Sequence, residues 1–119
     1  MKLNTTAEAN GVSIVNDPSG NPTKITIANS GVYNIQFSAQ IVIKTGGGGN
    51  HSIYIWLEQN GATVPWSNTV VELSASNQPQ VASWNFFIKT ITPNETFRIV
   101  WTADNTNIEI DASGSPLYG

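Results

Sequence analysis

Apolar residues recur at every second position in the segment 33–43. They occupy the odd positions from Tyr33 to Ile43, and the even positions up to Gln40 are polar. A two-residue period places the two sets of side chains on opposite faces of an extended strand. The pattern therefore predicts a β-strand with one buried face.

The segment 53–57 is apolar in both phases. Ile53, Ile55 and Leu57 share one phase, and Tyr54 and Trp56 lie in the other. A strand with two apolar faces needs a cover for each of them. We expect one face in the core and the other in an interface.

Short apolar segments and turn-forming residues follow one another along the rest of the chain, and no window shows a sustained helical period. Further strands are predicted at 12–15, 24–28, 70–73, 81–89, 97–101 and 108–110. Turns are predicted at 17–21 and at Asn60-Gly61. Seven or eight short strands predict an all-β, two-layer antiparallel sandwich or jelly roll. We expect a single domain over 1–119, with 1–10 as an extended arm.

The composition excludes several classes of partner and site. The five cations among 119 residues are spread along the chain, and the formal net charge is −3, so we expect no nucleic-acid partner. The apolar runs are shorter than a membrane span, and the first residues are not a hydrophobic signal segment, so we expect no membrane partner. The chain has no cysteine, which rules out disulfides and thiolate metal sites.

Few residues offer catalytic or metal chemistry. His51, the only histidine, follows a run of four glycines and is interpreted as a loop residue, because no acid and nucleophile stand at a supporting spacing. We therefore expect neither an enzyme nor a cofactor. Asp104, Asn105 and Asn107 are weak calcium candidates, since the same residues also form turns unaided.

The four tryptophans divide by phase. Trp84 and Trp101 alternate with apolar partners and are predicted to lie in the core. Trp56 and Trp66 are better candidates for an exposed or interfacial role.

Three segments together resemble a known family. GVYNIQFSAQ, IYIWLEQNGATVPWSN and VASWNFFIKTITPNETFRIVWTADNTNIEI resemble the globular head of complement and tumour necrosis factor relatives. The closer resemblance is to the form of that jelly roll found in virion structural proteins of tailed bacteriophages. It extends from about residue 11 onward and is carried by the order of Gly31-Val32-Tyr33, Trp56-Leu57, Asn60-Gly61, Ser83-Trp84-Asn85 and Trp101.

The resemblance implies a tumour necrosis factor-like jelly roll packed around a threefold axis. The side chains expected at that trimer interface are Tyr54, Trp56, Arg98 and Val100. Relatives continue past the position of Ser115 to Gly119 into a final apolar strand, which this sequence lacks. The alternatives are an open sheet, a strand supplied by another chain, and a fragmentary sequence.

The function expected from these observations is that of a non-enzymatic virion structural protein. It would be a homotrimeric capsid decoration or appendage tip on the particle surface, in contact with other virion proteins. The alternative is a carbohydrate- or receptor-binding module on a fibre or spike. Its loops would meet a host glycan or receptor through His51, Trp66, Asn68 and Asn105. A soluble signalling ligand is a third reading, which no collagen-like repeat or cysteine supports.

Overall fold

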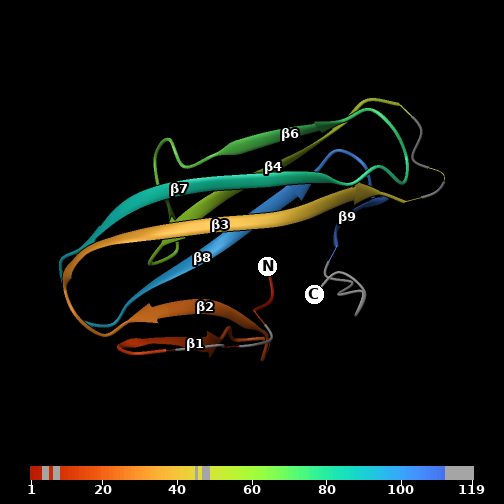
Figure 1. Cartoon of the computed structure of the whole chain (residues 1–119). Coiled ribbons are helices and arrows are strands. Elements are labelled where there is room, and N and C mark those ends of the chain that lie inside the picture. The colour runs from red at the N-terminus through yellow and green to blue at the C-terminus, as the bar shows by residue number, and fades with distance from the viewer. Residues whose placement is uncertain (4–5, 7–8, 45, 47–48, 112–119) are drawn as a thin grey trace. The chain divides into compact units, whose positions relative to one another are not determined.

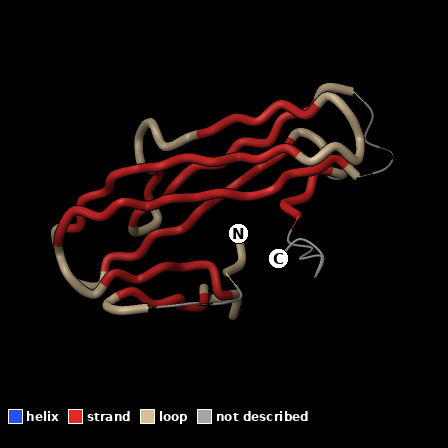
Figure 2. The backbone as a smooth tube through the Cα atoms, in the orientation of Figure 1, coloured by secondary structure: helices blue, strands red, loops and turns tan. Residues whose placement is uncertain are grey.

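The computed structural model of the chain describes residues 1–3, 6, 9–44, 46 and 49–111. These residues form nine strands and no helix (Figure 2). The strands are β1 (Val12–Asn16), β2 (Pro22–Ile27), β3 (Gly31–Ile43), β4 (His51–Gln59), β5 (Ala62–Thr63), β6 (Thr69–Leu73), β7 (Gln80–Thr90), β8 (Glu95–Ala103) and β9 (Ile108–Asp111). Among the described residues, no helix exists that could cross a membrane.

The strands belong to two antiparallel sheets, which form the layers of a β-sandwich (Figure 1). One sheet has the order β1-β2-β8-β4-β5, with β6 also paired to β4, and the other has the order β7-β3-β9. The all-β, two-layer antiparallel sandwich predicted from the alternation is therefore confirmed. The two-residue β5 was not predicted.

The predicted turn at 17–21 joins β1 to β2. The Asp17 carboxylate accepts hydrogen bonds from the N–H groups of Ser19 and Asn21, each at 2.9 Å. Val12 then pairs with Ile27 at the far end of the hairpin. An aspartate that caps its own turn in this way is a common source of turn stability.

The chain divides into two compact units, and β3, β4, β7 and β8 contribute residues to both. The first unit comprises Met1–Ile35, Ile55–Asn68 and Asn85–Trp101. Its buried apolar side chains are Ile27, Ile55, Leu57, Ile88, Phe97 and Ile99. The second unit comprises Gln36–Tyr54, Thr69–Trp84 and Thr102–Gly119. Its buried apolar side chains are Phe37, Ile41, Val42, Ile43, Ile53, Leu73, Ala82 and Ile108.

The two tryptophans predicted in the core differ in their burial. Trp84 is half-buried, and its ring centroid lies 5.2 Å from that of Phe37. Trp101 is 36% exposed, so its assignment to the core was wrong. Trp101 lies in the same alternating set on β8 as the buried Phe97 and Ile99. The described pairing of β8 with β2, however, ends at Phe97. Beyond that point the side chain has lost a neighbouring strand, and alternation alone cannot reveal this.

Two predictions concern the chain ends. Residues 112–119 lie outside the described residues, as do 4–5 and 7–8 of the predicted arm. Leu3 belongs to the described part of the arm, and its N–H donates to the Pro22 carbonyl at 2.7 Å. The extended arm, the missing last strand and the single-domain assignment stay predictions.

Candidate functional site

The outward face of β4 and β8 carries the residues expected at a trimer interface. The Asn60 N–H donates to the Thr96 carbonyl at 2.8 Å, and the two strands are neighbours in an antiparallel sheet. In an antiparallel pair the numbering runs in opposite directions, so four residues back along β4 and four residues forward along β8 place Trp56 opposite Val100. Both side chains are half-buried, in the phase opposite to the fully buried Leu57.

An ion pair lies beside this aromatic position on the same face. Glu58 Oε2 accepts hydrogen bonds from Arg98 Nε, at 3.0 Å, and from Arg98 Nη2. The Arg98 charge is thus paired within the chain. Tyr54, the next outward position before Trp56 on β4, is 38% exposed. The role of Tyr54, Trp56, Arg98 and Val100 in an interface stays a prediction.

A second group of outward apolar side chains was not singled out from the sequence. Val32 on β3 and Phe87 on β7 are each 68% exposed, and Ile91, just after β7, is 77% exposed. Phe87 and Ile91 alternate with the buried Ile88 and Thr90. The alternation of 81–89 could have revealed Phe87, because it lies opposite the core phase. This group, Val32, Phe87 and Ile91, is called the β3–β7 patch below.

A tight turn precedes β6 and lies in the green loop that leads into β6 in Figure 1. The Ser67 N–H donates to the Val64 carbonyl at 3.4 Å, which closes a four-residue turn. Pro65 and Trp66 are its central residues, and Trp66 has a φ of 62°. Proline in the second position and a positive φ in the third are the features of a type II turn, where the third residue is usually glycine.

The buried side chain of Ser67 fixes this turn to β4. Its hydroxyl accepts a hydrogen bond from the Leu57 N–H at 3.0 Å and donates to the Val64 carbonyl at 2.7 Å. The Val64 N–H in turn donates to the Leu57 carbonyl at 2.9 Å. The backbone on both sides of Trp66 is therefore held in place.

Trp66 itself is 96% exposed, and Asn68, two residues later, is also exposed. A bulky side chain in the left-handed region costs about 1–3 kcal/mol of backbone strain. The indole offsets none of this cost by burial. Of the tryptophans predicted to be exposed or interfacial, Trp66 is the one that the fold leaves in solvent.

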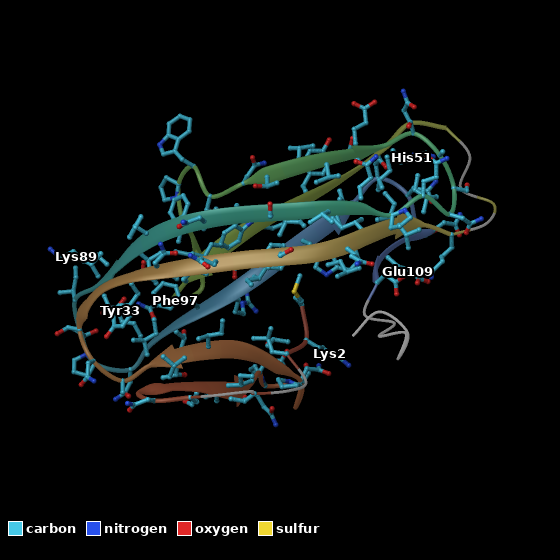
Figure 3. All side chains as sticks on the ribbon, viewed as in Figure 1. Lys2, Tyr33, His51, Lys89, Phe97 and Glu109 are labelled. Carbon is cyan, nitrogen blue, oxygen red and sulfur yellow. The ribbon has the colours of Figure 1, made fainter. Side chains whose placement is uncertain are left out.

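His51 lies at the start of β4, in contact with the segment between β8 and β9 (Figure 3). Its Nδ1 is 3.2 Å from Asp104 Oδ1, and its Nε2 is 2.9 Å from Asn105 Nδ2. Asn105 Oδ1 accepts the Asn107 N–H, so the amide offers Nδ2 to the ring and Nε2 is the acceptor. Both ring nitrogens thus link the histidine to this segment, and Nε2 is already occupied by an amide.

The three calcium candidates share these contacts. Asp104 Oδ2 accepts the Ser52 N–H at 3.0 Å, and Asn105 Oδ1 accepts the Asn107 N–H at 2.8 Å. The described residues contain no cluster of three or more His, Cys, Asp or Glu side chains suited to a metal ion. The Asp104 and Asn105 oxygens thus already accept hydrogen bonds that join β4 to the residues after β8 and close a turn. The calcium candidates stay a prediction. Two predicted recognition residues, His51 and Asn105, belong to this structural contact, while Trp66 lies in another loop.

A buried carboxylate that the sequence did not reveal fastens the turn between β7 and β8. Glu95 Oε1 accepts the N–H groups of Ile91 and Thr92, at 2.6 and 2.8 Å, and Oε2 accepts the amide N–H groups of Gln59 and Asn60. The Thr92 N–H, the Gln59 amide and the Ile91 N–H lower the pKa of Glu95 to about 2. The spacing of Thr92 and Glu95 is the signal that could have found it, since at helix N-termini a glutamate three residues after a threonine accepts the threonine N–H, and Glu95 accepts the Thr92 N–H in this strand-to-strand turn.

No protein-family model matches the chain, and no curated protein matches it either.

Proposed function

We propose that this chain is a non-enzymatic virion structural protein of a tailed bacteriophage. In this proposal it is a tumour necrosis factor-like jelly roll that assembles as a homotrimer on the particle surface, as a capsid decoration or an appendage tip. Its partners would be two further copies of itself and the virion proteins beneath them. The bacteriophage assignment is supported by the sequence resemblance.

The observation that carries the trimer proposal is Trp56, half-buried opposite Val100 on the outward face of β4 and β8. Tryptophan is enriched at protein interfaces, because it buries a large apolar area with few rotamers to order. The neighbouring Arg98 is already neutralised by Glu58, so a copy packing here would not bury an unpaired charge. The proposed seam is therefore centred on Trp56 and Val100, with Tyr54 and Arg98 beside them.

The geometry of His51 supports the non-enzymatic part of the proposal. A general base needs an accessible nitrogen within reach of the proton that it takes. The Asn105 amide occupies Nε2, and Asp104 lies against Nδ1. These contacts favour a structural role in joining the start of β4 to the residues after β8.

The proposal is tested by the solution mass of the chain, measured by light scattering on a sizing column at several concentrations. We expect a trimer, and Trp56→Ala should raise its dissociation constant by about tenfold or more. The matched control is Phe87→Ala, which removes a more exposed aromatic ring from the β3–β7 patch. This control should leave the trimer intact.

Other results would overturn specific parts of the proposal. A monomer at all concentrations would contradict trimerisation by this chain alone. A trimer that Phe87→Ala dissociates and Trp56→Ala does not would place the seam on the β3–β7 patch instead. An unchanged oligomer mass and melting temperature in Trp56→Ala would show that the residue has no part in assembly.

A further inference from the structure

We propose that the turn Val64–Ser67, together with the exposed Asn68, is a binding site for a neutral carbohydrate. Trp66 would be the surface on which one sugar ring stacks. The proposed site lies on the loop before β6 and does not depend on the seam at Trp56, so either proposal can fail without the other.

Folding gives no physical reason for a tryptophan at this position. The indole is 96% exposed, so its burial contributes nothing to stability. Its φ of 62° is a conformation that glycine adopts without strain and a bulky residue does not. Stability alone would favour glycine or asparagine in the third position of this turn. A strained, solvated aromatic residue that the surrounding structure holds in place is characteristic of a binding site.

The turn is already ordered before any ligand arrives. Pro65 has a fixed φ, and the buried Ser67 hydroxyl bonds both the Leu57 N–H and the Val64 carbonyl. The orientation of Trp66 therefore requires little additional backbone ordering on binding. Preorganisation of this kind raises affinity by lowering the entropy lost in the complex.

The chemistry around Trp66 selects the class of ligand. The ten residues from Gln59 to Asn68 include no charged side chain, so the loop offers no attraction to a phosphate, a sulfate or a cation. An indole face presents a flat apolar surface with negative partial charge, which suits the C–H face of a pyranose ring. The exposed Thr63 and Asn68 supply neutral hydrogen-bonding groups nearby, which a sugar hydroxyl can use.

The same surface fits other occupants less well. A stable protein partner buries on the order of 800 Å² on each side, which is far more than one indole supplies. Attachment to an anionic bilayer relies on clustered lysine or arginine, and the loop has neither. One sugar ring, in contrast, is about the size of the indole itself.

The experiment is a screen of the whole chain on an array of neutral and anionic glycans, followed by ligand-observed NMR titration with the best neutral hit. We expect at least one neutral glycan to bind in the millimolar range. Trp66→Ala should weaken binding more than tenfold, and Trp66→Phe should retain it within a few-fold, because it keeps an aromatic face. Phe87→Ala, a matched loss of an exposed ring on β7, should bind like the wild type.

A second variant separates binding from folding. Trp66→Gly should raise the melting temperature, because it relieves the positive φ, and should abolish glycan binding. Absence of any neutral hit would overturn the proposal, as would glycan binding that Trp66→Ala or Trp66→Gly retains. Binding only to anionic glycans or to vesicles containing phosphatidylserine would also overturn it. If Trp66→Ala changed the oligomer mass and no glycan bound, the occupant would be a second copy of the chain.

Discussion

The Ser67 hydroxyl oxygen lies 3.0 Å from the Leu57 backbone nitrogen and accepts its hydrogen bond. One small, buried side chain thus satisfies a backbone group of a fully buried strand position and fixes the turn that carries Trp66. Two features of this region that look unrelated in the sequence, a core leucine and a loop serine, are therefore energetically coupled.

Replacing this serine with alanine should destabilise the protein measurably. Ser67→Ala leaves the Leu57 N–H buried without its acceptor, which costs about 1–3 kcal/mol. Urea unfolding monitored by circular dichroism would measure the loss. Ser83→Ala, an exposed serine on β7, is the control and should change the unfolding free energy by no more than about 0.5 kcal/mol. Equal stability of the two variants would contradict the assigned role of Ser67.

Acid should destabilise the protein through Glu95. Its pKa is about 2 in the folded state and 4.5 ordinarily, so the folded state favours the ionised carboxylate. The resulting stability is fully present above pH 4.5 and is lost as the pH falls towards 2. Urea midpoints measured between pH 7 and pH 2 should therefore fall less steeply in Glu95→Gln than in the wild type.

Asp17 and Glu72 provide comparisons for the acid sensitivity of the Glu95→Gln variant. The N–H groups of Asn21 and Ser19 also lower the pKa of Asp17, so some acid sensitivity should remain in Glu95→Gln. Glu72→Gln removes one negative charge from an exposed position on β6 and should keep the wild-type slope. If Glu72→Gln flattened the profile as much as Glu95→Gln does, net charge rather than the Glu95 contacts would be responsible.

Gly61 should tolerate substitution poorly even though its surroundings are open. Its φ is 84°, and a Cβ added there would meet no atom within 4 Å. The cost of Gly61→Ala is therefore backbone strain alone, about 1–2 kcal/mol. Gly61→Asn should lose less, since asparagine enters the left-handed region more readily. Thermal unfolding of both variants would test this order, and a reversed order would show that another effect dominates.

The Asn105 side chain should protect the amide of Asn107 from exchange with solvent. Asn105 Oδ1 accepts this N–H at 2.8 Å. Asn105→Ala should therefore accelerate hydrogen exchange at Asn107, by about tenfold if the hydrogen bond contributes about 1.4 kcal/mol. Thr106→Ala, an exposed neighbour, is the matched control. Unchanged protection in Asn105→Ala would mean that the amide is held by the surrounding backbone instead.

The strands could be predicted from the sequence because alternation is a local property. Ile53, Ile55 and Leu57 share a phase, and all three are fully buried. Exposure at strand ends is not local, because it depends on how far the neighbouring strands extend. Trp101 shows this, since its phase predicts the core while β2 no longer accompanies β8 at that point.

The site residues were less predictable for a related reason. An isolated tryptophan such as Trp66 could be singled out by its poor fit to any strand pattern. Ser67 could not, because a serine beside a turn is an ordinary solvent-exposed residue in most sequences. For Glu95 the only local signal is its spacing of three residues from Thr92. Each of them also bonds a partner that is distant in the chain: Leu57 lies 10 residues from Ser67, and Gln59 lies 36 residues from Glu95.

The contact between Asn60 and Glu95 also bears on the chemical ageing of the protein. Asn60 is followed by Gly61, whose unhindered backbone nitrogen can attack the asparagine side chain and release ammonia. In the intact protein, Asn60 Nδ2 donates a hydrogen bond to Glu95 Oε2 at 3.0 Å. Deamidation would replace that donor with a carboxylate and set two negative charges against each other. Mass spectrometry of stored protein, with unfolding measured alongside, should therefore show stability declining in step with deamidation at this single position.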